Sequence, residues 1–315
     1  MGQPEYGKET PGNYSVAYAG GTPLREIQKH LPLRVLSPKD WQHWITWGFL
    51  IVSDAVPPTH VRRTVDILWE FTELDRDDPS TWERDQLAEH EMKELNNSGM
   101  VEIYNHQALW DNRQYPRVYE AFVDIWDTER LWVTIDRANL NTPNRGRRAF
   151  SGFLHWDYDT TLDPLPVSVQ GVLALVDTAG EMGGFQCVPE LFKDFDAWRR
   201  SQPPDRDPWH PDLTGYEVQQ VPMQAGDLLI FNSLLAHGIR PNLSNRPRIA
   251  QYISMTPAQE ENLPLRQERV RSWRERLPPQ GFAFPGDPRR WEQTRYPTAR
   301  LTPLGKKLLG LESWA

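Results

Sequence analysis

The sequence predicts a mostly β fold with supporting helices, built around a closed or double-sheet architecture such as a jelly roll. Two observations lead to this prediction. The chain of 315 residues contains 28 prolines, which break long helices and favour short strands joined by structured loops. From about Arg130 onward the apolar residues recur with a period of two, and seven short strand-like segments follow between Gly, Pro, Asn or Asp residues.

The first part of the chain is expected to form helices around one strand. A short helix is predicted from Ser37, which suits the N-cap, through Pro38, which suits the first helical position, to Gly48, which can end it. The other elements expected here are a strand at 49–56 and helices at 57–75 and 108–128.

The seven strand candidates occupy the middle of the chain. Their number and short, even spacing are typical of a β structure that closes on itself or folds into two sheets. They are predicted at 131–140, 153–159, 167–177, 184–190, 216–223, 226–233 and 248–255.

We expect a single domain over residues 1–315, because no shift in composition is sharp enough to mark a second one. No repeat with a fixed period is present, which argues against a solenoid or a propeller. Within the domain we expect a loose leader at 1–23, a helical N-terminal layer at 24–129, a jelly-roll core at 130–257 and a polar, Pro-rich C-terminal extension at 258–315.

Charge and cysteine content limit the classes of partner. The net charge of −8 and the pI near 5.6 argue against nucleic acid or an anionic membrane as the main partner. Cys187 is the single cysteine, so an internal disulfide is ruled out and a reducing compartment is favoured. The start of the chain lacks the pattern of a signal peptide. We therefore expect a cytoplasmic protein that acts on a small molecule.

A histidine and a carboxylate two positions apart suggest a metal site. Residues i and i+2 of a strand point to the same face, so His155 and Asp157 could converge on one ion. This pattern alone is weak, because His210 and Asp212 repeat it in a Pro-rich loop. His237 follows an apolar strand and can complete a set of two histidines and one carboxylate. That set is typical of non-heme Fe(II) sites, and the lack of nearby cysteines argues against structural zinc.

Arg248 stands eleven residues after His237, at the start of the last strand candidate. In that strand Ile249 and Ile253 are expected to face one way, and Arg248 the other. A buried guanidinium without a partner costs several kcal/mol, so an inward Arg248 requires an anion. A dicarboxylate cosubstrate would supply one, because the planar fork of arginine binds a carboxylate through two parallel hydrogen bonds.

Two other arginines compete with Arg248 for this role. Arg246 precedes Pro247, which biases it toward extended loop geometry, so Arg248 is preferred as the anchor. Arg240 is expected at the rim of the site.

The segments "HWD" and "HGIRPNLSNRPR", with the opening "LSPKDWQHWITWGFLIVSDAVPP", resemble the phytanoyl-CoA dioxygenase family of Fe(II)/2-oxoglutarate oxygenases. The resemblance runs from about Ser37 to Pro257. It implies a double-stranded β-helix, that is, a cupin-like jelly roll with iron inside. It maps His155, Asp157 and His237 onto the metal ligands of the family, and Arg248 onto the arginine that holds the far carboxylate of 2-oxoglutarate.

The resemblance also implies an activity. Fe(II), O₂ and 2-oxoglutarate would be required, and 2-oxoglutarate would be decarboxylated to succinate and CO₂ while an unactivated C–H bond of a small organic substrate is oxidised. Hydroxylation is the default outcome, and secondary metabolism is a suitable setting. Gln170 and Asn139 lie near positions that help to bind the cosubstrate in similar proteins. Related halogenases replace the carboxylate with a small residue, so Asp157 disfavours halogenation.

Several alternatives stay open at this point. Tyr104, His106 and Trp110 either line the substrate mouth or pack a helix against the sheet. The basic run at 144–150 is either a solvated lid or a grip for an anionic group. A cupin-like metal-dependent isomerase or lyase would need no arginine for a dicarboxylate, and a non-catalytic binding barrel would have little reason to keep all three ligands. The substrate and the oligomeric state are open.

Overall fold

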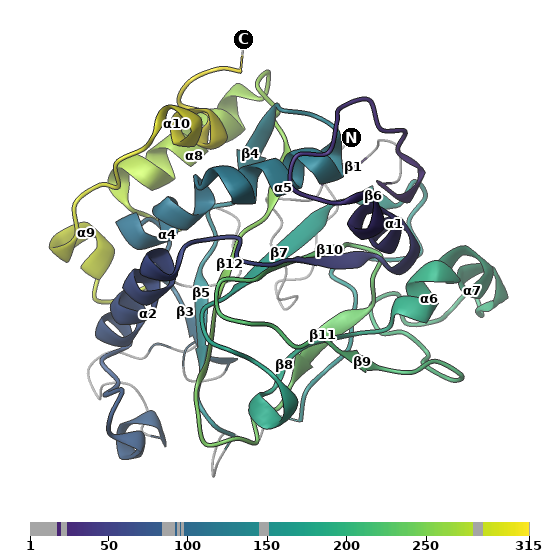
Figure 1. The fold of residues 1–315 in the computed structure, drawn as a ribbon, viewed down its shortest axis with the longest axis horizontal. Helices are drawn as coiled ribbons and strands as arrows, with labels where there is room; N and C mark the ends of the chain where they lie inside the picture. The colour runs from purple at the N-terminus through teal and green to yellow at the C-terminus, as the bar shows by residue number, and fades with distance from the viewer. Residues whose placement is uncertain are drawn as a thin grey trace.

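Two antiparallel sheets lie at the centre of the computed structural model, which describes residues 18–19, 24–83, 92, 95, 98–144, 151–279 and 286–314 (Figure 1). The larger sheet has the strand order β2 (Phe49–Val52), β10 (Leu228–Asn232), β7 (Val169–Ala174), β12 (Arg248–Tyr252), β5 (Ala138–Asn141) and β3 (Met100–Val101). The smaller sheet has the order β11 (His237–Arg240), β8 (Gly184–Cys187) and β9 (Gln219–Gln220). Two further pairs join β1 (Tyr18–Ala19) to β6 (Pro166–Val167) and β13 (Met255–Pro257) to β4 (Leu131–Val133).

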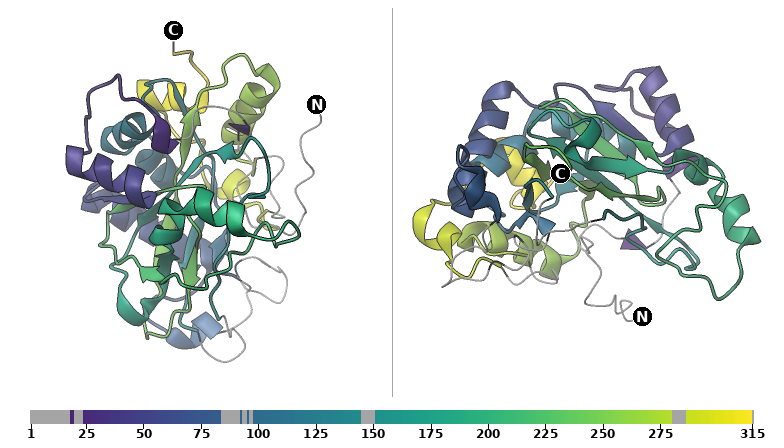
Figure 2. Two further views of the ribbon diagram at one scale, coloured as in Figure 1. Left: turned by 90° about the vertical axis from the view of Figure 1, so that its right-hand side faces the viewer. Right: turned by 90° about the horizontal axis from the view of Figure 1, so that it is seen from below.

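Most helices gather on one side of the six-stranded sheet, whereas the three-stranded sheet and the two short helices within residues 189–201 lie on the other (Figures 1 and 2). In chain order the helices are α1 (Pro38–Trp47), α2 (Pro58–Thr72), α4 (Gln107–Arg113), α5 (Pro116–Trp126), α6 (Pro189–Lys193), α7 (Phe195–Ser201), α8 (Leu263–Glu275), α9 (Trp291–Arg295) and α10 (Pro303–Leu309), with 3-10 turns at Leu24–Glu26, Pro79–Glu83 and Gly180–Met182. None of the helices in the described ranges is long and apolar enough to cross a membrane.

The central strands have two different faces. Val169 and Leu173 of β7 belong to the main hydrophobic core, whereas Gln170 and Val172 line a cavity. On β12, Ile249 and Ile253 belong to that core while Arg248, Ala250 and Tyr252 line the cavity, as the period of two predicts. The six-stranded sheet therefore separates the core from the cavity.

The first helix begins and ends where the sequence predicts. Ser37 and Asp40 form a reciprocal capping box, and Gly48 adopts a left-handed conformation with φ 77°. A Cβ atom at Gly48 would lie 2.7 Å from the ring of Phe192, so a side chain is excluded here by space as well as by backbone conformation. The helix expected at 108–128 is divided into α4 and α5, because Pro116 begins a new helix.

The prediction of a strand at 153–159 was wrong. His155 forms only an isolated bridge with His237. The next residue leaves the ladder, since the N–H of Trp156 donates to the carbonyl oxygen of Trp209 (2.8 Å) in a long loop. His155 and Asp157 thus do not owe their proximity to a regular strand.

The helical share is larger than the sequence suggested. Helices make up 35% of the described residues and strands 18%, so the fold is a mixture of helices and antiparallel sheets. Much of the difference comes from residues 258–315, where α10 packs against the core through buried Leu308 and Leu309, and α8 and α9 through partly buried Trp273 and Trp291. The predicted boundary at residue 130 also does not separate a helical layer from the sheets. Strands β2 and β3 precede it, yet β2 pairs with β10 and β3 pairs with β5 in the six-stranded sheet.

Candidate metal centre

Three side chains that the sequence singles out meet in one buried cluster. Nε2 of His155 lies 3.1 Å from Oδ1 of Asp157, and Nε2 of His237 lies 3.3 Å from Oδ2 of Asp157. One ligand atom from each residue falls within 4.8 Å of the other two. This spacing allows a single ion to contact all three side chains.

Backbone hydrogen bonds hold the two histidines together. The N–H of His155 donates to the carbonyl oxygen of His237 (2.8 Å), and the N–H of His237 donates to that of His155 (3.0 Å). Gly238 makes this crossing possible, because a Cβ atom there would collide with the carbonyl oxygen of Phe153. Two segments 82 positions apart in sequence are therefore fixed at contact distance by the main chain (His155 and His237).

The orientation of each ligand is set by a neighbour. Nδ1 of His237 lies 2.9 Å from the carbonyl oxygen of Leu235, so Nδ1–H donates there and Nε2, which faces Asp157, is the nitrogen left to bind a metal. The side-chain amide of Gln170 donates to Oδ2 of Asp157. Nδ1 of His155 is buried without a hydrogen-bond partner among the described residues.

The charge of the cluster also suits a cation. Burial alone would raise the pKa of Asp157, but the imidazoles of His237 and His155 outweigh it and hold that pKa well below its usual range. An ionised carboxylate beside two imidazole nitrogens is a donor set that fits Fe(II), and the part of the cluster that faces the cavity leaves room for further ligands.

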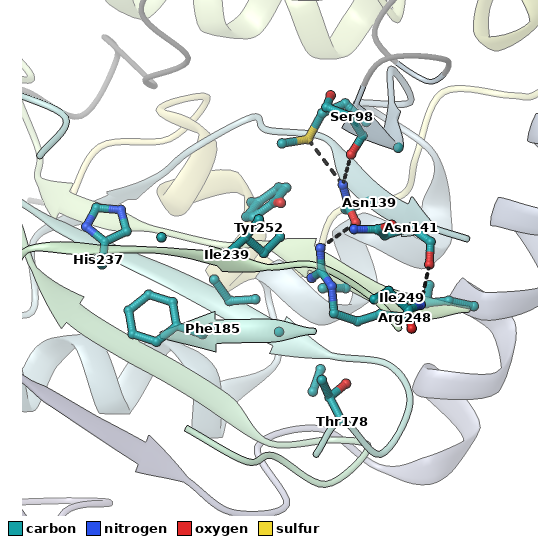
Figure 3. Close-up of a pocket in the computed structure, with 18 of the residues that line it drawn as sticks. Ser98, Asn139, Asn141, Thr178, Phe185, His237, Ile239, Arg248, Ile249 and Tyr252 are labelled. Atoms are coloured by element: carbon teal, nitrogen blue, oxygen red, sulfur yellow. Dashed lines mark hydrogen bonds between the residues drawn. The ribbon is translucent and has the colours of Figure 1, made fainter. Parts of the chain in front are cut away.

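The cavity has a volume of about 270 Å³ and reaches from the cluster to Arg248. Figure 3 shows His237 at one end and Arg248 near the other, with Tyr252 between them. Arg248 is 4% exposed, and burial lowers the pKa of its guanidinium. Its Nη2 donates to Oδ1 of Asn139 (2.8 Å), whose amide in turn donates to the carbonyl oxygen of Ser98 (3.0 Å).

Gln170 and Asn139 both line the cavity, yet each contacts another predicted residue of the site. Gln170 contacts Asp157, whereas Asn139 contacts Arg248. In the structure the two amides thus orient the charged groups at opposite ends of the cavity.

The weaker candidates for substrate contact lie outside the cavity lining, as far as the described residues define it. Tyr104 and Trp110 are buried in the core, and Nε1 of Trp110 donates to Oδ1 of Asn105 (3.2 Å). His106 is the N-cap residue of α4, where its ring accepts from the N–H of Ala108. These three residues pack or cap the helical layer.

Three other polar candidates lie apart from the site. Arg246 donates to the sulfur of Met182, and Arg240 donates to the carbonyl oxygen of Gly180. His210 pairs with Asp207 in an exposed loop. Of the basic run 144–150, only Asn144 lies within the described residues, and it lines the cavity.

Two sets of cavity residues were missed in the sequence. One is an aromatic wall, in which Phe185 stacks on His237 with ring centroids 5.7 Å apart and Phe231 lies at 4.4 Å from it. The other is the pair Asp136 and Arg137, just before β5. Arg137 lies two positions before Asn139 in one strand candidate, so both side chains are expected on the same face of the strand. This alternation was the signal that could have identified Arg137.

Known proteins resemble this chain in sequence. The family model described as phytanoyl-CoA dioxygenase (PhyH) matches residues 46–250. The "Ava biosynthesis cluster protein O" of Aspergillus versicolor is 24% identical over 234 residues, which cover 67% of this chain and 74% of that protein.

Solved structures share the fold over most of the chain. The Candida albicans protein "GlcNAc Inducible Gene 2" has a TM-score of 0.63 at 13% identity and covers 88% of this chain and 77% of its own. The Escherichia coli protein JW0805 has a TM-score of 0.62 at 15% identity and covers 87% and 82%. At such identities the likeness concerns the fold alone.

Proposed function

The chain belongs to the phytanoyl-CoA dioxygenase family, and on this premise we propose that it is an Fe(II)/2-oxoglutarate-dependent oxygenase that hydroxylates an unactivated C–H bond of a small organic substrate. The proposed fold of the core is a double-stranded β-helix, which the two facing antiparallel sheets support. The observation that carries the proposal is the convergence of His155, Asp157, His237 and Arg248 on one cavity.

In this proposal His155, Asp157 and His237 hold Fe(II). Two neutral imidazoles and one carboxylate leave the other coordination positions open, as non-heme oxygenases require. When bound, iron together with 2-oxoglutarate and O₂ supplies the oxidising chemistry, with succinate and CO₂ as coproducts. Gln170 keeps the carboxylate of Asp157 in place through its amide, and Leu235 fixes the tautomer of His237.

Arg248 binds the far carboxylate of 2-oxoglutarate. Its guanidinium is buried, lines the cavity and accepts no hydrogen bond itself, so it suits an anion. Asn139 accepts a hydrogen bond from Nη2 and so holds one edge of the guanidinium. The rest of the guanidinium lines the cavity. The aromatic wall around His237 excludes water from the end where the substrate is oxidised.

Arg248 also separates this function from its alternatives. A metal-dependent isomerase or lyase on the same fold does not require a buried cation opposite the metal centre, and neither does a binding barrel. Asp157 supplies the carboxylate that halogenases lack, which supports hydroxylation over halogenation.

The test is spectroscopic and needs no substrate. Fe(II) followed by 2-oxoglutarate, added without O₂, is expected to give a visible charge-transfer absorption that His237→Ala abolishes. Succinate release upon admission of O₂, measured over a panel of small organic molecules, then reports turnover. A protein that binds Fe(II) but gives neither the absorption nor succinate is not a 2-oxoglutarate oxygenase.

A further inference from the structure

A second buried arginine lines the cavity, and the proposed chemistry does not use it. Arg137 is 4% exposed and directly precedes β5. Oδ1 of Asp136 accepts both the backbone N–H of Arg137 (2.8 Å) and its Nη1 (3.2 Å). The guanidinium of this ion pair lies in the cavity wall, where a ligand in the cavity can reach it.

The register of the sheet places Arg137 apart from the cosubstrate anchor. Arg248 is opposite Asn141 on β5, whereas the N–H of Tyr252 donates to the carbonyl oxygen of Arg137 (3.2 Å). The two arginines therefore stand four residues apart along the strands, or about 13 Å between their backbones. The two guanidinium groups thus come from separate parts of the cavity wall.

Arg137 lies on the metal side of Arg248. Val172 of β7 is opposite Tyr252, and Gln170, which contacts Asp157, is one step further along the same face. Two strand spacings and one such step separate the backbones of Arg137 and Gln170 by about 12 Å. An arginine side chain covers roughly half of that distance. A substrate whose anionic group binds Arg137 would therefore need only a few bonds between that group and the carbon atom at the metal centre.

The rest of this end of the cavity is apolar. The rings of Phe185 and Phe231 lie at 4.8 Å from each other, and Phe153 lies at 4.8 Å from the ring of His155. Phe153 is 41% exposed although it lines the cavity, which places it at the mouth. Aromatic walls with one buried charged group are typical of sites that bind an apolar molecule in a fixed orientation.

We propose that Arg137 binds the substrate through a carboxylate, and that the substrate is a small carboxylic acid with an apolar body. The proposal rests on the proposed function, since it assigns the substrate class of the same site. Arg137 is a binding residue in it, and Asp136 is a positioning residue that fixes one edge of the guanidinium. A guanidinium carries five N–H donors and can bind a carboxylate beside Asp136.

Asp136 also favours a monoanion. An anion bound to Arg137 also meets the carboxylate of Asp136, and a phosphate with two negative charges would meet more repulsion there than a carboxylate with one. A carboxylate keeps the bidentate geometry with less repulsion. The cavity of about 270 Å³ is also of a size for a small acid.

Equilibrium binding tests the proposal without turnover. The protein loaded with Fe(II) and 2-oxoglutarate in the absence of O₂ is titrated by calorimetry with 4-phenylbutanoate, decanoate and the primary amide of each. We expect at least one acid to bind about tenfold more tightly than its amide, because the amide lacks the charge that arginine recognises. Equal binding of acids and amides would overturn the proposal.

Variants assign the preference to Arg137. Arg137→Gln is expected to remove the preference for the acid while the amide and 2-oxoglutarate bind as before, and Arg137→Lys is expected to keep a reduced preference because it keeps the charge but not the fork. Arg240→Gln, which lies outside the cavity lining, is the matched control. An acid preference that persists in Arg137→Gln would contradict the assignment. If that variant does not fold, the comparison of Arg137→Lys with the wild type still decides whether Arg137 is responsible for the preference.

The test also separates the two proposals. A charge-transfer absorption with Fe(II) and 2-oxoglutarate, but no preference for acids, refutes the substrate class alone. Absence of that absorption refutes the oxygenase function itself.

Discussion

The side-chain amide of Gln170 donates a hydrogen bond to Oδ2 of Asp157, so the six-stranded sheet holds the carboxylate of the metal cluster. Asp157 itself lies outside any regular strand and needs this support to keep its direction. The two residues thus couple the irregular segment after His155 to the rigid centre of the fold.

Replacement of this amide is expected to weaken the metal site. Gln170→Leu leaves Oδ2 of Asp157 without its donor, and loss of a hydrogen bond that orients a metal ligand typically reduces metal affinity by about 10-fold to 100-fold. Anaerobic titration with Fe(II) measures the change. Gln219→Leu, on the exposed strand β9, is the matched control and should bind Fe(II) as the wild type does. If both variants bind Fe(II) with the same affinity, Gln170 does not support the metal site.

Loss of the buried guanidinium is expected to affect the cosubstrate alone. Arg248→Ala should raise the 2-oxoglutarate concentration needed for the charge-transfer absorption by about 100-fold, because a hydrogen-bonded charge pair in a buried site is lost. The affinity for Fe(II) should stay the same. Arg246→Ala serves as the control, since that side chain contacts Met182 instead of the cavity. The anchor is assigned wrongly if Arg246→Ala gives the larger change.

A carboxylate at the end of α5 should make stability depend on pH. Burial would raise the pKa of Asp127, but the N–H of Leu31, the Lys29 ammonium and His30 outweigh it and lower that pKa to about 2. A lowered pKa contributes stability above about pH 4, and this contribution is lost as the pH falls toward 2. It amounts to about 2 kcal/mol at neutral pH.

Asp127→Asn removes this contribution and tolerates the left-handed backbone of position 127, where φ is 54°. The free energy of unfolding in urea, compared at pH 7 and pH 3, is the measurement. The difference between wild type and variant should shrink at the lower pH. A difference that is the same at both values would mean that charge does not contribute.

The C-terminal helices should depend on one arginine. Arg269 of α8 is buried and donates to the carbonyl oxygens of Leu308, Leu309 and Val133. Arg269→Ala removes one donor from each of three carbonyl groups and should cost about 2–4 kcal/mol in the free energy of unfolding. Arg271→Ala, on the same helix, breaks a surface pair with Glu268 and should cost less than about 1 kcal/mol. Similar costs for the two variants would refute the locking role of Arg269.

Local signals in the sequence were sufficient for the capped helix and for the alternating strands. Ser37, Pro38 and Gly48 act through their own backbone geometry, and the two faces of β12 follow from a period of two. The prediction failed where the decisive contact is distant. Trp156 leaves the ladder because of Trp209, and nothing near residue 156 in the sequence indicates that partner.

The same distinction applies to the site. The structure brings His155, Asp157, His237 and Arg248 to one cavity, and their roles stay a prediction. These four residues were singled out because their types and spacing suit few kinds of site besides an iron centre with a dicarboxylate cosubstrate. Arg137 was not, because an adjacent Asp and Arg have the composition of an ordinary solvated pair. Only the pairing of β5 with β12 shows that the guanidinium is buried. Helix α8 was missed because the proline in its first turn also suits an irregular tail.

Gly238 has a consequence for how the protein can change during evolution. The separation between the imidazoles of His155 and His237 depends on the absence of a side chain at position 238, since even one methyl group there would collide with the main chain at Phe153. New specificities can arise by exchange of the surrounding aromatic side chains, which move independently of the backbone crossing. Position 238 has no such freedom, because any larger residue would push the ligand-bearing segments apart before it altered the preference for a substrate.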